Sequence, residues 1–402
     1  MRKYDFESII DRRGMDALAV DGLGKIPGFA PEPPKEGFDV IPMWVADMNF
    51  NAPAVLTEAI ADRVRHPLFG YFMPRDEYFQ KIIDWHRVRN GVEGMEPKHI
   101  GYENGVLGGL VAVLNAYMQS GDKVLVHRPT YVGFTGSITG AGYEIVHSDL
   151  YQDADGIWRM DFADMDRKIK ENNIKIAVFC NPHNPCGRAW THEEMEQAAE
   201  VYRQNDCIVI SDEIWSDLLL FGNKHIPFQS LNDDARNRTV ALYAPSKTFN
   251  LAGLIGSYHV IYNDEIRRNV RKTSAKSHYH SMNVLSMHAL LGAYTEEGME
   301  WADELKEVLS ENVQFTCDYL EKNMPDFETT RPEATYMLFL DCEKWCKRTG
   351  KSMDDLLKAG WDVGVAWQDG RPFKEGYYIR LNLALPLSRI QEAFDRLQKY
   401  VY

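Results

Sequence analysis

Short apolar runs alternate with helical patterns between residues 70 and 293, and no other feature constrains the fold as strongly. The runs have the length and composition of buried strands. They are "DKVLV" (122–126), "IKIAVF" (174–179), "CIVIS" (207–211) and "TVALY" (239–243). Between them, apolar residues recur at helical spacing, as in 106–118. Strands that alternate with helices predict an α/β fold whose mostly parallel sheet is covered on both faces.

A different pattern follows from about Ser286. A long helical region precedes two strand-like runs, 336–341 and 377–384, and a closing helix after Pro386. This order is typical of a smaller α+β domain. A chain of 402 residues is long enough for two domains. We expect a large domain over 46–288, and a small domain formed by 1–45 together with 289–402.

The charge balance limits the partners. The chain has 45 Lys and Arg against 59 Asp and Glu, a net charge of -14, which repels nucleic-acid phosphates and anionic membrane surfaces. We therefore expect no nucleic-acid and no membrane partner. The amino terminus lacks the apolar run of a signal peptide, and no apolar stretch reaches the roughly 18 residues of a membrane span. The six cysteines are scattered, which suits a reducing cytoplasm.

Cys180, His183 and Cys186 lie close together in the sequence and could suggest a metal site. Their spacing matches no zinc motif, and the prolines between them fix a turn. We therefore expect no metal.

Polar loops follow the apolar runs directly. Ligands of open α/β sheets bind outside the carboxyl ends of the strands, so these loops are expected to line one crevice. Lys247 lies in one of them, in an apolar setting unusual for a lysine. The loops are "HRPTYVGF" (127–134), "NPHNPCGR" (181–188), "SDEIWSD" (211–217) and "APSKTFNLAGL" (244–254).

Six motifs, in order, resemble the fold type I pyridoxal 5'-phosphate (PLP) enzymes, and within them the aminotransferase-like cystathionine β-lyase and C–S lyase group. The resemblance covers the chain nearly end to end and implies a PLP-dependent transferase-like fold, PLP as cofactor and an amino-acid substrate. Each motif alone is weak or moderate; the ordered set is specific. The motifs are "MWVADMNF" (43–50), "GYFMP" (70–74), "NPHNPCGRAW" (181–190), "SDEIWSD" (211–217), "SKTFNLAGL" (246–254) and "IRLN" (379–382).

The resemblance implies three catalytic residues. Lys247 would hold PLP covalently and then act as the base that removes the substrate Cα proton, which requires an amine partly neutral near neutral pH. Asp212 would pair with the pyridine nitrogen and keep it protonated. Arg380 would bind the substrate carboxylate through two parallel hydrogen bonds. The alternatives are a solvated loop lysine, a strand-end aspartate that caps the next segment and a structural ion pair.

Further residues would bind the cofactor. Asn184 would donate to the phenolic oxygen of PLP, and Tyr131 would stack on its ring. A turn-forming asparagine and a core tyrosine are the alternatives. Trp215 stands where relatives usually have the Tyr or His that touches the phenolate; an indole N–H donates but cannot accept or titrate.

The strand–glycine–helix junction would receive the phosphate of PLP. The N–H groups of Gly105, Val106 and Leu107 open a helix, and Ser246 could add its hydroxyl. Such a junction can also be only a tight turn. Tyr71 matches a family tyrosine that reaches the phosphate in the neighbouring subunit, which implies a homodimer with shared active sites; otherwise it would be a core aromatic.

Two residues of this chain depart from the family pattern. Many relatives carry an Arg or another polar residue eight positions after the lysine to hold the phosphate, and this chain has Ile255. Asn49 replaces a second aspartate of the "ADMDF" motif. Because Ile255 is apolar, phosphate affinity must come from other groups.

The residues predict a PLP enzyme that acts on an α-amino acid, and the lyase-like motifs favour a carbon–sulfur β-lyase, of the cystathionine or cysteine-S-conjugate type. Such an enzyme cleaves L-cystathionine or S-substituted L-cysteines to pyruvate, ammonia and a thiol. An aminotransferase is the first alternative, because it needs the same three residues. A non-catalytic regulatory protein of the PLP fold is the second.

Overall fold

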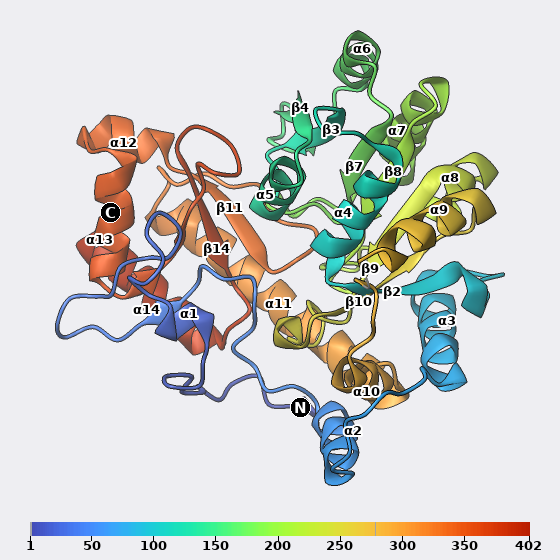
Figure 1. The fold of residues 1–402 in the computed structure, drawn as a ribbon. Helices are drawn as coiled ribbons and strands as arrows, with labels where there is room; N and C mark the ends of the chain where they lie inside the picture. Colours follow the sequence, from blue (N-terminus) through green and yellow to red (C-terminus); the bar gives the residue numbers. More distant parts are fainter. Residues whose placement is uncertain (1, 278) are drawn as a thin grey trace.

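The computed structural model describes residues 2–277 and 279–402, which form two lobes (Figure 1). The larger lobe contains a seven-stranded sheet. Its strands, in sheet order, are β2 (Ile100–Asn104), β10 (Gly256–Val260), β9 (Thr239–Tyr243), β8 (Ile208–Asp212), β7 (Ile176–Cys180), β3 (Lys123–Arg128) and β4 (Glu144–Asp149).

The five strands from β9 to β4 are parallel, and β10 is antiparallel to both β9 and β2. The predicted α/β class with a mixed, mostly parallel sheet is therefore confirmed, and all four apolar runs form strands. The antiparallel β10 was not predicted. Its sequence "GSYHV" contains polar residues and does not read as an apolar run, although the strand is buried.

Helices cover both faces of the sheet because the strand side chains alternate. Val124 and Val126 face one hydrophobic core, and Leu125 faces the other. The first face packs against α4 (Val106–Tyr117), α5 (Val132–Gly140) and α9 (Asp264–Ala275). The second packs against α6 (Phe162–Asn172), α7 (His192–Gln204) and α8 (Asp233–Arg238). Outside these layers lie α2 (Ala54–Arg65), α3 (Asp76–Asn90) and α10 (Val284–Ala293).

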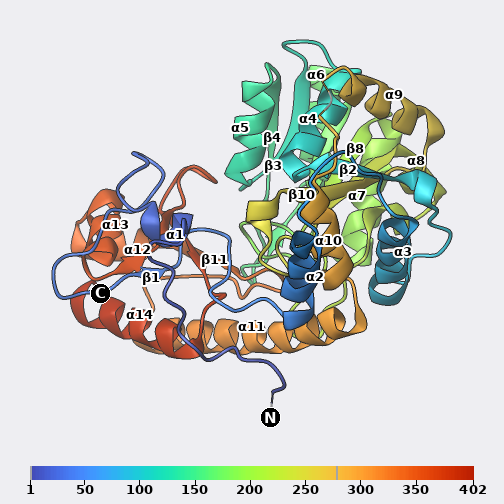
Figure 2. The same ribbon diagram turned by 60° about the horizontal axis from the view of Figure 1, so that its bottom comes forward.

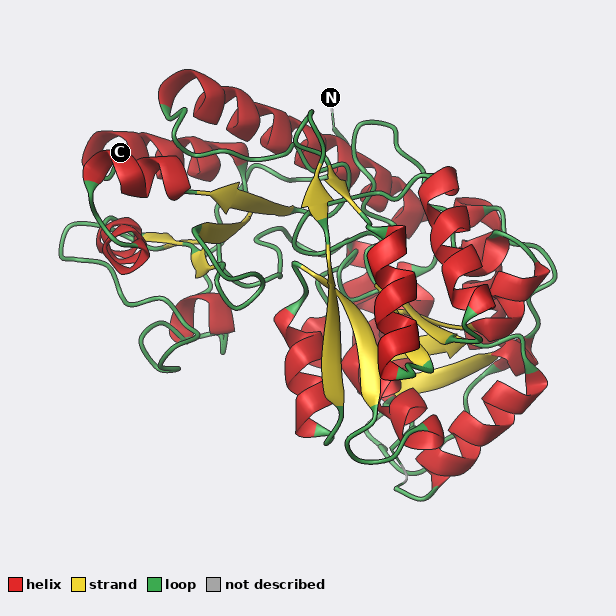
Figure 3. Cartoon of the chain, turned by 90° about the horizontal axis from the view of Figure 1, so that it is seen from above, coloured by secondary structure: helices red, strands yellow, loops and turns green. Residues whose placement is uncertain are grey.

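The smaller lobe contains a three-stranded antiparallel sheet, in the order β11 (Met337–Asp341), β14 (Tyr378–Asn382) and β13 (Gln368–Asp369). Figure 3 shows the two sheets in separate lobes. The amino-terminal arm joins this lobe where β1 (Ile41–Pro42) pairs with β12 (Val365–Ala366). The helices of the lobe are α1 (Leu18–Asp21), α12 (Glu343–Thr349), α13 (Met353–Asp362) and α14 (Leu387–Tyr400).

A long helix, α11 (Glu296–Asn323), runs beneath the molecule from the large lobe towards α14 (Figure 2). Its buried residues belong to the same core as those of α14 and β11. The division into a large domain over 46–288 and a small domain formed by 1–45 and 289–402 stays a prediction. No helix in the described ranges is both long and apolar enough to span a bilayer.

Candidate active site

A cavity of about 310 Å³ opens where β7, β8 and β9 end. These strands are parallel, so their carboxyl ends meet at one edge of the sheet, and the turn between β2 and α4 completes the wall. Every predicted site residue except Arg380 and Tyr71 lines the cavity. These lining residues are Lys247, Asp212, Asn184, Tyr131, Gly105, Val106, Leu107, Ser246 and Trp215.

Lys247 follows β9 and points its amine into this space. Nζ donates to the carbonyl oxygen of Ala46 at 2.8 Å and lies 5.5 Å from the ring centroid of Trp215. Burial and the nearby Arg380 cation lower the pKa of Lys247 to about 8. About a tenth of the amine is therefore neutral at pH 7, far more than of an ordinary lysine, as a nucleophile or base requires.

Asp212 is the last residue of β8 and is buried. Its Oδ1 accepts a hydrogen bond from the backbone N–H of Ile214 at 3.1 Å, and none of the described cations forms an ion pair with it. Burial raises the pKa of Asp212 to about 7. A donor cation in the cavity would restore its ionised form, which is the relationship expected with a protonated pyridine nitrogen.

Arg380 lies on β14, just outside the cavity lining, and is buried at 3% exposure. Its Nη1 donates to Oδ1 of Asn184 at 3.2 Å, which leaves the amide nitrogen of Asn184 free to donate elsewhere. Its guanidinium lies over the ring of Phe373, 4.5 Å from the centroid. Burial lowers the pKa of Arg380 to about 10, so the side chain remains a cation.

No carboxylate in the described part of the chain pairs with Arg380, and its Nε–H has no hydrogen-bond partner. The structural ion pair considered as an alternative is therefore absent from the described residues. A buried cation without an anion is costly, so this position calls for an anionic ligand.

Gly105 supplies the turn at the start of α4. Its φ of 79° lies in the left-handed region that glycine adopts without strain. The turn points the unpaired N–H groups of the first turn of α4 at the cavity, where an anion would be stabilised. Ile255 also lines the cavity, with a φ of 56° that is unusual for a β-branched residue.

Trp215 is buried, and its ring meets the edge of Tyr336 with the centroids 4.8 Å apart. The hydroxyl of Tyr336 donates to the carbonyl oxygen of Ala46 at 2.9 Å, the same acceptor that Lys247 uses. Sequence reasoning missed Tyr336, because "ATYML" reads only as the start of an apolar strand. Tyr336, just before β11, and the 43–50 segment are far apart in the sequence, so no local sequence pattern indicates that they are in contact.

The 43–50 segment is held by several polar side chains that the sequence reading also missed. Asn382 donates to the carbonyl oxygens of Val45 and Asp47, and Asn250 donates to that of Met48. Arg12 of the amino-terminal arm forms an ion pair with Asp47 at 2.6 Å. These contacts fix the backbone whose Ala46 carbonyl receives the Lys247 amine.

Tyr71 does not reach the cavity of its own chain. It lies in the loop between α2 and α3, fully exposed, together with Leu68, Phe69 and Met73. The core-aromatic alternative for Tyr71 is therefore wrong. An exposed apolar loop of this kind is typical of an interface with another molecule.

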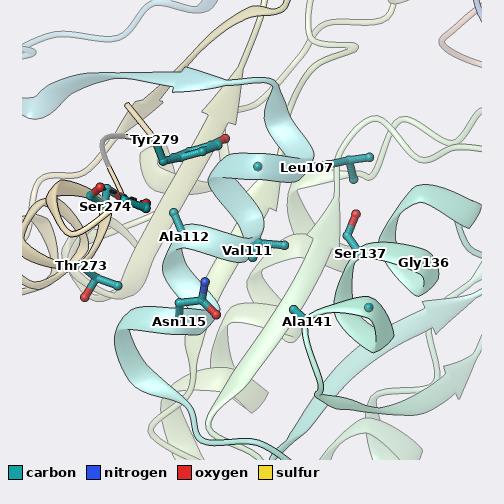
Figure 4. Close-up of a pocket in the computed structure, with 13 residues that line it drawn as sticks. Leu107, Val111, Ala112, Asn115, Gly136, Ser137, Ala141, Thr273, Ser274 and Tyr279 are labelled. Atoms are coloured by element: carbon teal, nitrogen blue, oxygen red, sulfur yellow. Dashed lines mark hydrogen bonds between the residues drawn. The ribbon is translucent and has the colours of Figure 1, made fainter. Parts of the chain in front are cut away.

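A second cavity of about 460 Å³ lies between α4, α5 and the end of α9 (Figure 4). Its wall is built mostly from small residues, and it shares Leu107 with the Lys247 cavity. Tyr279 borders it and donates its hydroxyl to the carbonyl oxygen of Asn104 at 3.0 Å, beside the Gly105 turn. None of the described residues that line this cavity has a charged side chain.

The residues of the Lys247 cavity fit PLP. Its volume is near the lower end of small-ligand sites, roughly 300–1,000 Å³. It offers a partly neutral amine for the aldehyde, a buried carboxylate without a cation for the ring nitrogen, and a helix amino terminus for the phosphate. No described cation forms an ion pair with the Asp212 carboxylate, which accepts only the Ile214 N–H among the described hydrogen bonds.

The two-lobed fold and the Lys247 cavity together define a class of protein, and comparison with known families identifies that class. A family model, aminotransferase class I and II, matches residues 39–397. The chain belongs to this family. Cystathionine β-lyase PatB of Bacillus subtilis (strain 168) is 32% identical over 394 residues, which cover 98% of this chain and 99% of PatB.

Two solved structures have the same fold over nearly their whole length. The PLP-bound C–S lyase from Staphylococcus hominis superposes with a TM-score of 0.88 at 31% identity, covering 100% of this chain and 99% of that one. Cystalysin from Treponema denticola, which contains a pyridoxal 5'-phosphate cofactor, gives 0.89 at 28% identity, covering 98% of both chains. The predicted family and the PLP-dependent fold are thus confirmed.

Proposed function

We propose that this protein is a PLP-dependent carbon–sulfur β-lyase that cleaves S-substituted L-cysteines, L-cystathionine among them, to pyruvate, ammonia and a thiol. The observation that carries the proposal is the unpaired buried cation Arg380 beside the partly neutral amine of Lys247. Together they offer a place for the carboxylate and the α-amino end of one amino acid. The names of PatB and of the Staphylococcus hominis and Treponema denticola enzymes favour carbon–sulfur cleavage.

The bound PLP supplies an electron sink for the pair left when the Cα proton departs. Lys247 would hold the cofactor through Nζ; once the amino group of the substrate has displaced it, the freed Nζ would take that proton, for which its lowered pKa is suited. Asp212 stays ionised against the ring nitrogen. Arg380 orients the substrate through its carboxylate, so that the Cα–H bond faces Lys247.

Turnover without an acceptor tests the reaction. Purified holoprotein is incubated with L-cystathionine in the absence of any keto acid, and pyruvate and thiol are measured. Catalytic formation of both products is expected, and Lys247→Ala should abolish it. Consumption of L-cystathionine only after addition of a keto acid, without release of pyruvate or thiol, would instead identify an aminotransferase.

We further propose that the enzyme works as a homodimer with shared active sites and in the cytoplasm. The exposed loop that carries Tyr71 supports the dimer, because a second copy would cover its apolar side chains. Tyr71 would then reach the phosphate in the partner subunit, where Ile255 replaces the Arg or other polar residue of many relatives. The six free cysteines support a reducing compartment.

A further inference from the structure

Gln368 is the residue that contacts Arg380 most closely. It lies on the short strand β13, directly opposite Arg380 of β14, and is buried at 5% exposure. Its Oε1 accepts a hydrogen bond from Nη2 of Arg380 at 2.5 Å. Nothing in the surrounding sequence, "AWQDG", marks this residue, because the pairing of β13 with β14 is decided by the fold.

The other donors of the guanidinium show what this contact occupies. Nη1 donates to Asn184, Nη2 donates also to the carbonyl oxygen of Trp44 at 3.2 Å, and Nε has no partner among the described residues. A guanidinium binds a carboxylate through two parallel N–H groups, along the edge that joins Nε to Nη2 or the edge that joins the two Nη atoms. Nη2 belongs to both edges, and both of its hydrogens are already engaged.

A carboxylate can therefore accept a second hydrogen bond, from Nη2, only if the Trp44 carbonyl oxygen or Gln368 Oε1 gives up its own hydrogen bond to Nη2. The Trp44 oxygen is a backbone atom of the tightly held 43–50 segment, whereas Gln368 can leave by rotation of its side chain. A hydrogen bond from a guanidinium to a charged oxygen is roughly twice as strong as one between neutral groups. An incoming carboxylate can thus outcompete the neutral amide oxygen of Gln368.

We propose that Gln368 is an internal competitor of the substrate: it occupies the carboxylate-binding edge of Arg380 when no substrate is bound and yields it to the α-carboxylate of an amino acid. This inference rests on the role of Arg380 in the proposed function. Its consequence is a lower affinity for every ligand that has to displace Gln368 from this edge. A carboxylate offsets this loss through its charge-assisted hydrogen bonds to Arg380, whereas a neutral carboxamide only replaces one neutral acceptor with another, so free amino acids bind more tightly than their amides.

Calorimetric titration of the holoprotein tests this with L-alanine, which has an α-carboxylate but no leaving group on Cβ, and with L-alaninamide. Gln368→Met keeps the length of the side chain and removes the amide. We expect it to bind both ligands about fivefold more tightly, because neither has to displace a hydrogen bond. Since the same competitor is lost for both, the ratio of the two affinities should stay unchanged.

Gln368→Glu places a permanent carboxylate on the same edge. We expect L-alanine to bind at least about tenfold more weakly than to the wild type, with partial recovery at acid pH as the new carboxyl becomes protonated. Asp369→Asn is the matched control on the same strand, because Asp369 contacts Arg371 and not Arg380. It should leave both affinities at the wild-type values.

Kinetics separates this role from a merely structural one. With S-ethyl-L-cysteine, Gln368→Met should lower KM and leave kcat unchanged, since Gln368 is displaced before the chemical step. Weaker binding of L-alanine by Gln368→Met, wild-type affinity in Gln368→Glu, or no binding of L-alanine by the wild type would overturn the proposal. Absence of carbon–sulfur cleavage with the predicted binding pattern intact would refute only the proposed reaction.

Discussion

Asp212 combines two properties that conflict unless a ligand is present: its carboxyl group is buried, and none of the described cations neutralises it. Burial raises its pKa from 3.8 to about 7. Because folding raises this pKa, the folded protein binds the proton more tightly than the unfolded chain does. The ionised carboxylate therefore costs stability as the pH rises from about 4, and the cost is complete above about pH 7.

The cofactor-free form of Asp212→Asn should therefore be more stable than the cofactor-free wild type, by up to about 4 kcal/mol above pH 7 and by little near pH 4. Urea denaturation of both proteins between pH 4 and 8 measures the difference. The same variant should bind PLP less tightly, because the neutral amide cannot keep the ring nitrogen protonated. A stability difference that does not change with pH would show that Asp212 is not a buried, unneutralised carboxylate.

Lys247 differs from a surface lysine in the pH at which its amine becomes nucleophilic. Its pKa is lowered to about 8, so its modification by PLP followed by borohydride should rise steeply as the pH passes through 8 in the cofactor-free protein. Mass spectrometry of the peptide that contains Lys247 measures this. Exposed lysines, with ordinary pKa values near 10.4, serve as the internal control. Labelling of Lys247 in parallel with them would contradict the lowered pKa.

At the scale of elements, the start of α4 depends on one backbone conformation. Among the described residues, a Cβ on Gly105 would meet Ile255 alone, at 3.8 Å, so there is space for a side chain, but a φ of 79° is unfavourable for any other residue. The effect of a substitution is therefore conformational. It would turn the N–H groups of the first turn away from the phosphate.

Gly105→Ala should therefore lower stability by roughly 1–2 kcal/mol and reduce PLP affinity by about tenfold. Gly121→Ala is the matched control. Gly121 has a φ of 88° and open space around its Cβ position, but it lies in the loop after α4, away from the cavity. It should lose similar stability and keep its affinity for PLP. Equal affinities of the two variants, measured by fluorescence titration, would show that the turn does not bind the phosphate.

At the scale of the whole molecule, the amino-terminal arm, the large lobe and the small lobe all contribute to one site. Arg12 and the 43–50 segment come from the first part of the chain, Lys247 from the large lobe and Arg380 from the small one. If Tyr71 completes the site of a partner subunit, the active unit is the dimer.

Mixed dimers test this sharing. Lys247→Ala and Tyr71→Ala subunits are each expected to have little activity as pure dimers. After mixing and subunit exchange at equal amounts, about a quarter of the sites should combine a native Lys247 with a native Tyr71 from the other subunit, because a two-fold dimer pairs each site with the opposite loop. Activity should then rise towards that fraction. No gain, with exchange verified by mass spectrometry, would mean that Tyr71 does not act across the interface.

The sequence alone determined the features that depend on local pattern. Apolar runs and helical spacing predicted the parallel strands and α4, and the loops after those strands predicted that Lys247, Asp212 and Asn184 would share one cavity, because carboxyl ends of parallel strands meet. The ordered motifs predicted the family, which the comparison confirmed.

Only the tertiary structure decided the contacts between distant segments. The approach of Tyr336 and Lys247 to one carbonyl of Ala46, and of Gln368 to Arg380, joins parts of the chain whose separate sequences carry no sign of each other. Burial is likewise a property of the packed molecule: it sets the pKa values of Lys247 and Asp212, which no residue pattern specifies. The physical reason is the same in each case, since desolvation and long-range hydrogen bonds exist only after the lobes have assembled.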